Sequence, residues 1–332
     1  MGKQRIIYLD VIRILACVMI IMMHAPIPNT GISSVILSTN GLLTAPGVGL
    51  FIMVSGALLL PVIMPTKDFL RKRLTKILCP TLFWTLVYMT IKLVQGDVVL
   101  SELPSYLASI PFSPQFNGVL WFIYMLIGLY LVAPIISPWL EKTSRRELEL
   151  YLELWGITLC YPLIRSFVGV NESNTGILYY LGGYAGYFLL GYYLRRYSLR
   201  IPFIVCIILI ALPIISGAYC KLRGVSVDFY DVFWYLSILT VIAAVGWFGL
   251  IQEIQPSNNH NWIVLVSNCC FGIYLSHIFV MRTILWNWHF LQELDGLTQI
   301  ATTTVLTLIG GFLITWLLSL LPIGSYLVGY KK

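Results

Sequence analysis

Charged side chains are scarce in this chain. They make up 11% of its 332 residues, whereas hydrophobic residues make up 58%. Because a soluble domain carries about 25% charged residues, a soluble fold of this length would lack the polar surface that water requires. A bilayer removes that requirement, since lipid tails accept apolar side chains all round a helix. The composition predicts a single integral membrane domain over residues 1–332 rather than two soluble domains.

Cysteine patterns typical of metal sites or disulfide scaffolds are absent from the sequence. The seven cysteines form no CxxC pair, and most of them lie in apolar runs. Isolated thiols in such surroundings are usually buried and inert. We find neither a metal-ligand spacing nor a disulfide framework, so the sequence predicts no metal site.

Long apolar runs are abundant, and they predict an all-α, polytopic membrane bundle of about ten transmembrane helices. About 20 apolar residues are enough to cross the hydrocarbon core. The predicted spans are about 6–25, 46–64, 77–95, 118–138, 148–168, 177–194, 202–218, 232–251, 262–284 and 300–321. Asp10 and Arg13 interrupt the first span and no cleavage site follows it, so we interpret this span as a retained helix rather than a signal peptide.

Lysine and arginine gather in alternate loops, and this pattern predicts the orientation of the chain. Fifteen of the 21 basic residues fall on one side if the spans alternate: Lys3, Arg5, Lys67, Arg71, Lys72, Arg73, Lys76, Lys142, Arg145, Arg146, Arg195, Arg196, Arg200, Lys331 and Lys332. Cytoplasmic loops collect such residues, so both termini are predicted to be cytoplasmic. Orientation also explains the net charge of +7, and we expect no nucleic-acid partner.

The first span carries polar side chains that cost free energy in a membrane and need an explanation. Asp10 and Arg13 are three residues apart and can pair on one helix face. Arg13 and His24 are eleven apart, nearly three turns, so they share a face at roughly 16 Å along the axis. A structural interpretation is also available, in which Arg13 reaches cytoplasmic headgroups and His24 caps the helix end.

The basic segment between residues 67 and 76 is predicted to be a short loop. Its five bases suit an anionic ligand such as a nucleotide phosphate, although orientation alone also explains them. The loops on the opposite side, at about 26–45 and 96–117, are long enough to form a lid or an acceptor-binding surface.

Three further polar residues lie within predicted spans. Ser55 belongs to a stretch of small residues, which is typical of close helix packing. Tyr124 lies among aromatic residues of the fourth span, which often form an interfacial belt. His277 lies deep in the ninth span, where it is either a buried neutral histidine or part of a polar tunnel.

The order and spacing of these residues resemble the membrane acyltransferase-3 family over nearly the whole chain. The matching segments are Leu9-Asp10-x-x-Arg13, His24, Phe51-x-x-x-Ser55-Gly56, Phe69-Leu70-x-x-Arg73-x-x-Lys76-Ile77-x-x-Pro80, Leu120-Trp121-Phe122, Leu129-Tyr130-Leu131 and Phe271-Gly272-Ile273-Tyr274-Leu275-x-His277. The resemblance implies a multi-pass enzyme of the bacterial cytoplasmic membrane. It would use cytoplasmic acyl-CoA, usually acetyl-CoA, to acylate a sugar hydroxyl of a surface or lipid-linked glycan, as an O-acetyltransferase does.

The resemblance also implies functional residues. The family's essential histidine and arginine correspond to His24 and Arg13. Its basic R-x-x-R motif corresponds here to Arg73-x-x-Lys76, where lysine keeps the charge but lacks the planar fork of arginine. We expect Arg71, Arg73 and Lys76, with Arg195, to bind the phosphates of CoA.

In the mechanism that fits these residues, His24 is the general base on the acceptor hydroxyl, and Asp10 holds Arg13. Ser55, Tyr124 and His277 are candidates for stabilising the oxyanion or lining a tunnel. Direct transfer and a covalent acyl-histidine remain open, as do the acceptor, the acyl chain and homo-oligomerisation.

A secondary transporter or glycan flippase is the alternative function. Transporters also place Asp, Arg and His within multi-span bundles. However, we find no internal repeat and no matched pair of broken helices in the sequence, so the residues favour an acyltransferase.

Overall fold

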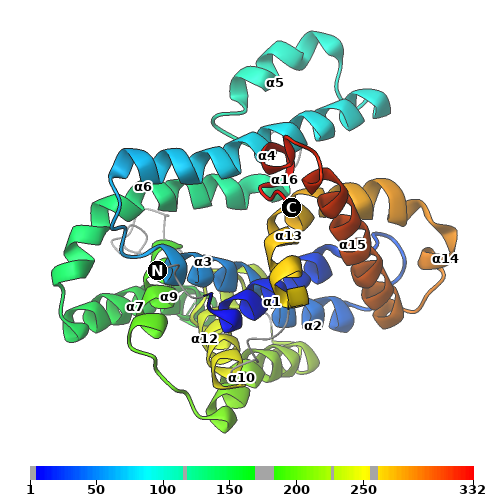
Figure 1. Cartoon of the computed structure of the whole chain (residues 1–332). Coiled ribbons are helices and arrows are strands. Elements are labelled where there is room, and N and C mark those ends of the chain that lie inside the picture. The colour runs from blue at the N-terminus through cyan, green and yellow to red at the C-terminus, as the bar shows by residue number, and fades with distance from the viewer. Residues whose placement is uncertain (1–4, 115–117, 169–182, 226–227, 255–260) are drawn as a thin grey trace. The chain divides into compact units, whose positions relative to one another are not determined.

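The structure is a computed structural model that describes residues 5–114, 118–168, 183–225, 228–254 and 261–332. All regular elements within these residues are helical (Figure 1). A helix satisfies its backbone N–H and C=O groups internally, which lipid requires of any segment it surrounds. The predicted all-α fold class is confirmed.

Seven helical stretches of the described residues are long and apolar enough to cross a membrane. They are α1 (Ile7–His24), α2 with α3 (Ser34–Thr44 and Pro46–Leu59), α4 (Thr66–Gln95), η2 with α6 (Gly118–Leu120 and Trp121–Lys142), α10 (Phe203–Leu222), α13 with η3 and η4 (Asn261–Ile278, Phe279–Ile284 and Leu285–Asn287) and α15 (Gly296–Ser319). The short elements are η1 (Leu100–Glu102), α5 (Leu103–Ser109), α11 (Phe229–Val232), α14 (His289–Gln292) and α16 (Gly324–Val328).

The other three predicted spans also coincide with helices. These are α7 (Arg145–Val168), α9 (Ala185–Arg196) and the shorter apolar helix α12 (Ile238–Ile254). Residues 177–182, at the start of the sixth predicted span, lie outside the described residues. The count of ten spans and the side of each terminus therefore remain predictions.

The predicted loop at 26–45 is mostly helical, which corrects the sequence analysis. Ser33 caps α2, because its hydroxyl accepts the backbone N–H of Ile36 at 3.3 Å. Ala45 keeps helical backbone angles between α2 and α3. Pro46 is tolerated there because the first residue of a helix needs no intrahelical N–H bond. The segment 96–117 also contains helical turns, η1 and α5.

Contacts between Cα atoms divide the chain into two compact units, which we describe separately. Unit 1 comprises Met1–Leu60, Trp139–Ser267 and Trp288–Val305. Unit 2 comprises Pro61–Pro138, Asn268–Asn287 and Leu306–Lys332.

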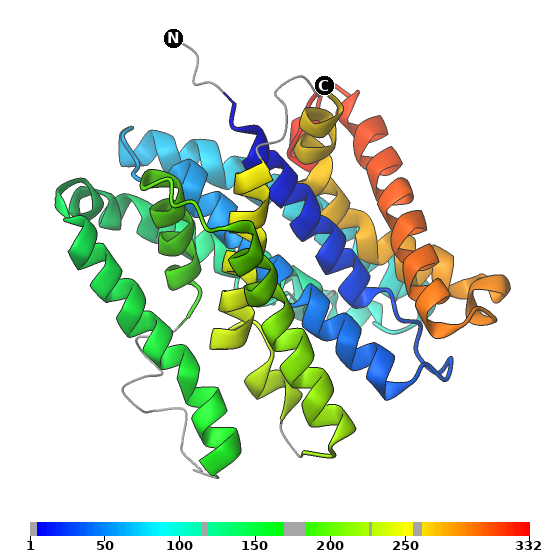
Figure 2. The ribbon, with the colours of Figure 1, turned by 90° about the horizontal axis from the view of Figure 1, so that it is seen from below.

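Helix α3 is the centre of unit 1, where it packs against α1, α9 and α12 (Figure 2). Glycines permit this close approach. A Cβ added at Gly56 would overlap the Phe188 carbonyl of α9, and one added at Gly191 would overlap the Met53 carbonyl of α3. Gly47 similarly faces α1. The glycine-lined surface of α3 therefore fixes the position of α1 and of the polar residues that α1 carries.

In unit 2, the short helix α16 packs against α4. Pro80 has no N–H, so the Lys76 carbonyl lacks its usual partner in α4. The chain leaves α16 through Gly329, whose φ is +72° and whose added Cβ would lie 2.7 Å from the Phe271 ring and 3.3 Å from the Lys76 oxygen. Only glycine suits both this backbone conformation and this approach, which places α16 beside the basic turns of α4.

Replacing Gly56 or Gly191 with alanine is expected to lower the midpoint of thermal unfolding in detergent. The added Cβ has no room against Phe188 or Met53, and such overpacking costs about 1–3 kcal/mol. Gly128→Ala in α6 is the control, because nothing lies within 4 Å of its added Cβ and alanine favours a helix. Equal unfolding midpoints for the three variants would contradict the packing described.

Candidate functional site

The basic segment at 67–76 forms the first turns of α4, so the prediction of a loop was wrong. The helix begins at Thr66, after Pro65, and extends to Gln95. Asp68 lies in its first turn, where a carboxylate is favourable, and the leucine, lysine and arginine that follow are good helix formers. Hydropathy identifies the apolar part of a helix, whereas the helix itself continues beyond the lipid.

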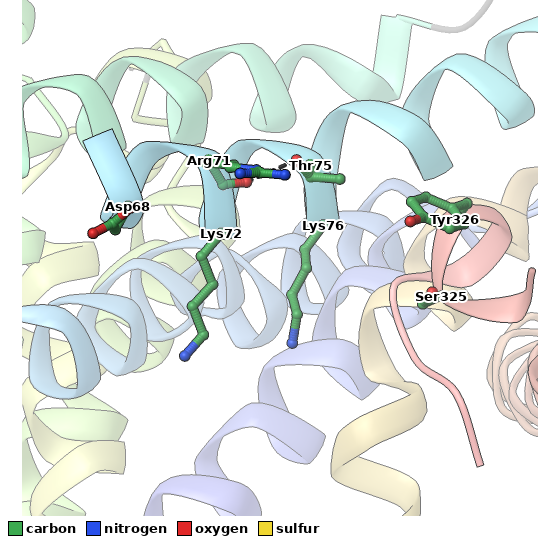
Figure 3. A pocket seen from close by; sticks show the side chains of 7 residues that line it. All are labelled: Asp68, Arg71, Lys72, Thr75, Lys76, Ser325 and Tyr326. Carbon is green, nitrogen blue, oxygen red and sulfur yellow. Dashed lines mark hydrogen bonds between the residues drawn. The ribbon is translucent and has the colours of Figure 1, made fainter. Parts of the chain in front are cut away.

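A cleft of about 390 Å³ lies over the basic face of α4, within unit 2 (Figure 3). It is lined by Asp68, Arg71, Lys72, Thr75 and Lys76 of α4 and by Ser325 and Tyr326 of α16. Lys72 and Lys76 are one turn apart, and their amines extend in the same direction. Three cations thus face the cleft with a single carboxylate, an arrangement that suits a polyanionic ligand.

Two of the four predicted phosphate-binding residues do not line this cleft. Arg73 lies on a different face of α4, and its Nε is buried without a hydrogen-bond partner among the described residues. Arg195 belongs to unit 1, where its Nη1 donates to the Ala57 carbonyl at the end of α3, a favourable place for a cation. Lys72, which the sequence motif leaves out, joins Arg71 and Lys76 instead.

On α1, Asp10 is buried and held by several partners, all within unit 1. Only 4% of Asp10 is exposed. Arg5 donates from Nε at 2.7 Å and from Nη2 at 2.9 Å to the two carboxylate oxygens. The predicted pair with Arg13 is present but longer, at 3.5 Å. The principal charged partner of Asp10 is therefore Arg5, in the bidentate geometry that favours arginine–carboxylate pairs.

Ser267, in α13, connects Asp10 to Arg13. Its hydroxyl donates to Asp10 Oδ1 at 2.6 Å and accepts from Arg13 Nη1 at 3.0 Å. About 25% of the Arg13 side chain is exposed, so a ligand can reach the guanidinium while Ser267 and Asp10 orient it. Sequence reasoning missed Ser267 because it lies 254 residues from Arg13, and a single sequence carries no signal for such a contact.

His24 is the last residue of α1, and it is partly exposed. Because α1 is helical from Ile7 to His24, the predicted relation between Arg13 and His24 holds. The two residues share a helix face at roughly 16 Å along the axis, from a rise of 1.5 Å per residue.

The backbone on both sides of His24 is fixed by side chains of other helices in unit 1. Asn40 of α2 donates from Nδ2 to the Met22 carbonyl at 3.0 Å. Gln299 of α15 accepts the Ile27 N–H at 3.3 Å, and this glutamine is fully buried. The end of α1 is thus held in place by a contact before His24 and another after it.

Asp295 starts the helix that supplies Gln299. Its Oδ1 accepts the N–H groups of Leu297 and Thr298, both at 3.2 Å. Hydrogen bonding, chiefly with the Thr298 side chain, holds the pKa of the Asp295 carboxyl below its usual range. This cap stabilises the helix start above the ordinary carboxyl pKa, and its contribution is lost as the pH falls through the lowered pKa.

Ser55 and Tyr124 direct their hydroxyl protons at backbone carbonyls. Ser55 donates to Phe51 of its own helix at 2.9 Å, and Tyr124 donates to Ile110 at 2.6 Å. An oxyanion donor must aim its proton at the reacting oxygen. In this conformation both hydroxyls instead stabilise the local backbone.

His277 is 1% exposed, and its Nδ1 lies at the Tyr274 carbonyl, within unit 2. A carbonyl accepts but does not donate, so this contact places the proton on Nδ1. In the neutral ring Nε2 is then an acceptor. That tautomer suits a base or a hydrogen-bond acceptor better than an oxyanion donor.

Tyr88 of α4 inserts its hydroxyl into the backbone ladder around His277, a feature that sequence reasoning missed. In an α-helix the Phe279 N–H would bond to the Leu275 carbonyl. Instead, the Tyr88 hydroxyl donates to that carbonyl at 2.7 Å and accepts the Phe279 N–H at 3.3 Å. The π-helical turn η3 begins at this point, and π-turns often mark functional sites.

Tyr88→Phe is expected to lower the stability of unit 2 by about 1–3 kcal/mol, because two buried backbone groups lose their partner. Hydrogen exchange should become faster at Phe279. Thermal unfolding and exchange mass spectrometry in detergent measure the two effects. Tyr151→Phe is the matched control, since Tyr151 is 46% exposed and contacts Trp139 through its ring. Unchanged exchange in Tyr88→Phe would show that the hydroxyl does not hold the turn.

Ser267→Ala is expected to destabilise the protein by about 1.5–3 kcal/mol, the range for hydrogen bonds to charged groups. The variant removes the Ser267 hydroxyl from both Asp10 and Arg13, while the contacts of Asp10 with Arg5 and Arg13 remain. Ser216→Ala provides the comparison, since the Ser216 hydroxyl donates to the Pro213 carbonyl of its own helix and bridges no charged groups among the described residues. Denaturation of both variants in detergent measures the difference, and similar stabilities would argue against a bridging role for Ser267.

The comparison with protein families identifies the chain. The acyltransferase-3 family, described as an acyltransferase domain, matches residues 6–320. Neither the search of curated proteins nor that of solved structures gave a match. The matched range includes the polar residues of α1 and the basic face of α4. The chain therefore belongs to the membrane acyltransferase-3 family and is a membrane acyltransferase.

Proposed function

We propose that the chain moves an acyl group, specifically acetyl, from cytoplasmic acyl-CoA to a sugar hydroxyl of a surface or lipid-linked glycan. Acyl transfer itself follows from the family. The observation that supports a CoA donor is the cleft on α4, where three cations face a space of about 390 Å³. We further propose that the protein works in the bacterial cytoplasmic membrane.

The cleft matches the chemistry of CoA. The nucleotide end of CoA carries several phosphate groups, which need concentrated positive charge. Arg71 can bind a phosphate through two parallel N–H bonds, whereas Lys72 and Lys76 act as point charges. Tyr326, which is 51% exposed at the edge of the cleft, offers a ring on which a purine can stack. The charge distribution predicts that the basic turns of α4 lie on the cytoplasmic side.

His24 is the proposed general base of the transfer. Neutral imidazole accepts the proton of the acceptor hydroxyl as the oxygen attacks the thioester carbonyl carbon. Collapse of the tetrahedral intermediate forms the ester bond and breaks the carbon–sulfur bond. The proton passes from His24 to the departing thiolate, so CoA leaves as the thiol and the histidine is neutral again.

Arg13 is proposed to be a binding residue on the same face of α1. Its partners Asp10 and Ser267 fix the direction of the guanidinium, and the exposed part of the side chain remains available to a ligand. Asp10 and Arg5 act through this orientation and do not touch the reacting atoms.

The proposal predicts that different substitutions affect donor binding and turnover. His24→Ala should retain acetyl-CoA affinity and lose CoA release. Combining Lys72→Gln with Lys76→Gln should raise the Kd for acetyl-CoA about tenfold, because two ion pairs are lost. Lys67→Gln is the control, since Lys67 is exposed in the same helix but does not line the cleft. Isothermal titration and a thiol-release assay on purified protein measure both quantities.

Two results would overturn the proposal. If the folded wild-type protein does not bind acetyl-CoA, the donor is wrong, and another acyl donor must be sought for this family member. If Lys67→Gln weakens binding as much as the double variant, general surface charge rather than the cleft attracts the donor.

A further inference from the structure

A second cleft lies in unit 1, bounded by α2, by the end of α10 and by the segment that contains α11. Its volume is about 330 Å³, near the lower end of the range for small-molecule sites. Its lining includes Ser38, Gly217, Cys220, Lys221, Phe229 and Phe233. Neither the family match nor the proposed donor site assigns a role to this cleft.

Glycines bring the walls of the cleft together. A Cβ added at Gly217 of α10 would lie 2.6 Å from Leu42 of α2, and one added at Gly41 would lie 3.0 Å from the Phe229 ring. Phe233 is 3% exposed and clusters with Leu42 beneath the cleft. The cleft therefore has a packed aromatic floor rather than an accidental gap between side chains.

The lining combines features that suit a sugar ring. The ring of the partly exposed Phe229 offers an apolar face, with the buried Phe233 ring 5.8 Å from it, and the C–H groups of a pyranose pack well on such a face. Ser38 donates to the Ser34 carbonyl at 2.8 Å, so its oxygen can accept a hydrogen bond from a sugar hydroxyl. A mainly apolar pocket with a few placed polar groups is typical of small-molecule binding.

Lys221 gives the cleft a positive charge. Lys221 is exposed and lies in the last turn of α10. Arg223 is also exposed, but it does not line the cleft, and its guanidinium lies over the Tyr219 ring at 5.7 Å. Lys221 is thus the basic residue among those lining the cleft, and it favours a ligand with an anionic group.

Helix α2 connects this cleft to the end of α1. Ser38 lines the cleft, and Asn40, two residues later, donates to the Met22 carbonyl just before His24. Helix α2 also packs against both α1 and α10. In the predicted orientation, Ser38, Lys221 and His24 all lie toward the extracytoplasmic side, where an acceptor glycan would be presented.

We propose that this cleft binds an acidic sugar of the acceptor glycan, with its ring over Phe229 and its carboxylate at Lys221. The inference rests on the proposed function, because that function supplies the glycan. It adds the class of sugar and the residues that select it.

The test measures sugar binding directly, without any acyl donor. Methyl β-glucuronide and methyl β-glucoside are the probes, since they differ in the carboxylate. Saturation-transfer NMR on the purified full-length chain in detergent compares the wild type with Lys221→Gln and with the matched control Arg223→Gln. Lys221→Gln should weaken glucuronide binding about two- to fivefold, as expected for one exposed ion pair, and leave glucoside binding unchanged. Arg223→Gln should change neither.

A second variant tests the aromatic floor. Phe229→Leu keeps an apolar side chain but removes the ring, so it should weaken both probes to a similar extent. The proposal is overturned if the wild type binds neither sugar, if it does not prefer the glucuronide, or if Lys221→Gln and Arg223→Gln behave alike. Because no donor is present, a failure of acetyl-CoA binding leaves this result unaffected, and the two proposals can fail separately.

Discussion

A polar group inside a membrane helix must find its partner within the protein, and this constraint organises the functional part of α1. Water is absent from the hydrocarbon core, so an unpaired carboxylate there would be costly. Asp10, which is 4% exposed, meets this requirement through Arg5, Arg13 and Ser267. The same contacts that lower the cost of burying Asp10 also orient Arg13. The same hydrogen bonds therefore stabilise the fold and position a proposed binding residue.

The same constraint explains why irregular backbone in unit 2 occurs beside polar side chains. The Tyr88 hydroxyl replaces an α-helical bond of α13 and thereby permits the π-turn next to His277. Local irregularity in a membrane helix is tolerated where neighbouring groups compensate for the lost bond.

Hydropathy predicted the helical fold, and helices coincide with the described part of each predicted span, but several helix ends were misplaced. Hydropathy reports how strongly a segment prefers lipid to water. A helix, however, ends where its capping and backbone conformation require. Helix α4 begins at Thr66, eleven residues before the predicted span at 77, because charged residues continue a helix readily. Helix α2 occupies most of a segment that was predicted to be a loop. Neither boundary depends on hydrophobicity.

The candidate site was predictable where its residues share one helix and unpredictable where they come from different segments. Arg13 and His24 keep the relation that their spacing implies, whereas Ser267 meets Arg13 only through the fold. Lys72 was left out because the family's basic motif, Arg73-x-x-Lys76 here, does not include it. At about 100° per residue, a helix places Arg71, Lys72 and Lys76 on one side and Arg73 beyond it. Arg73, whose Nε is buried, does not line the cleft.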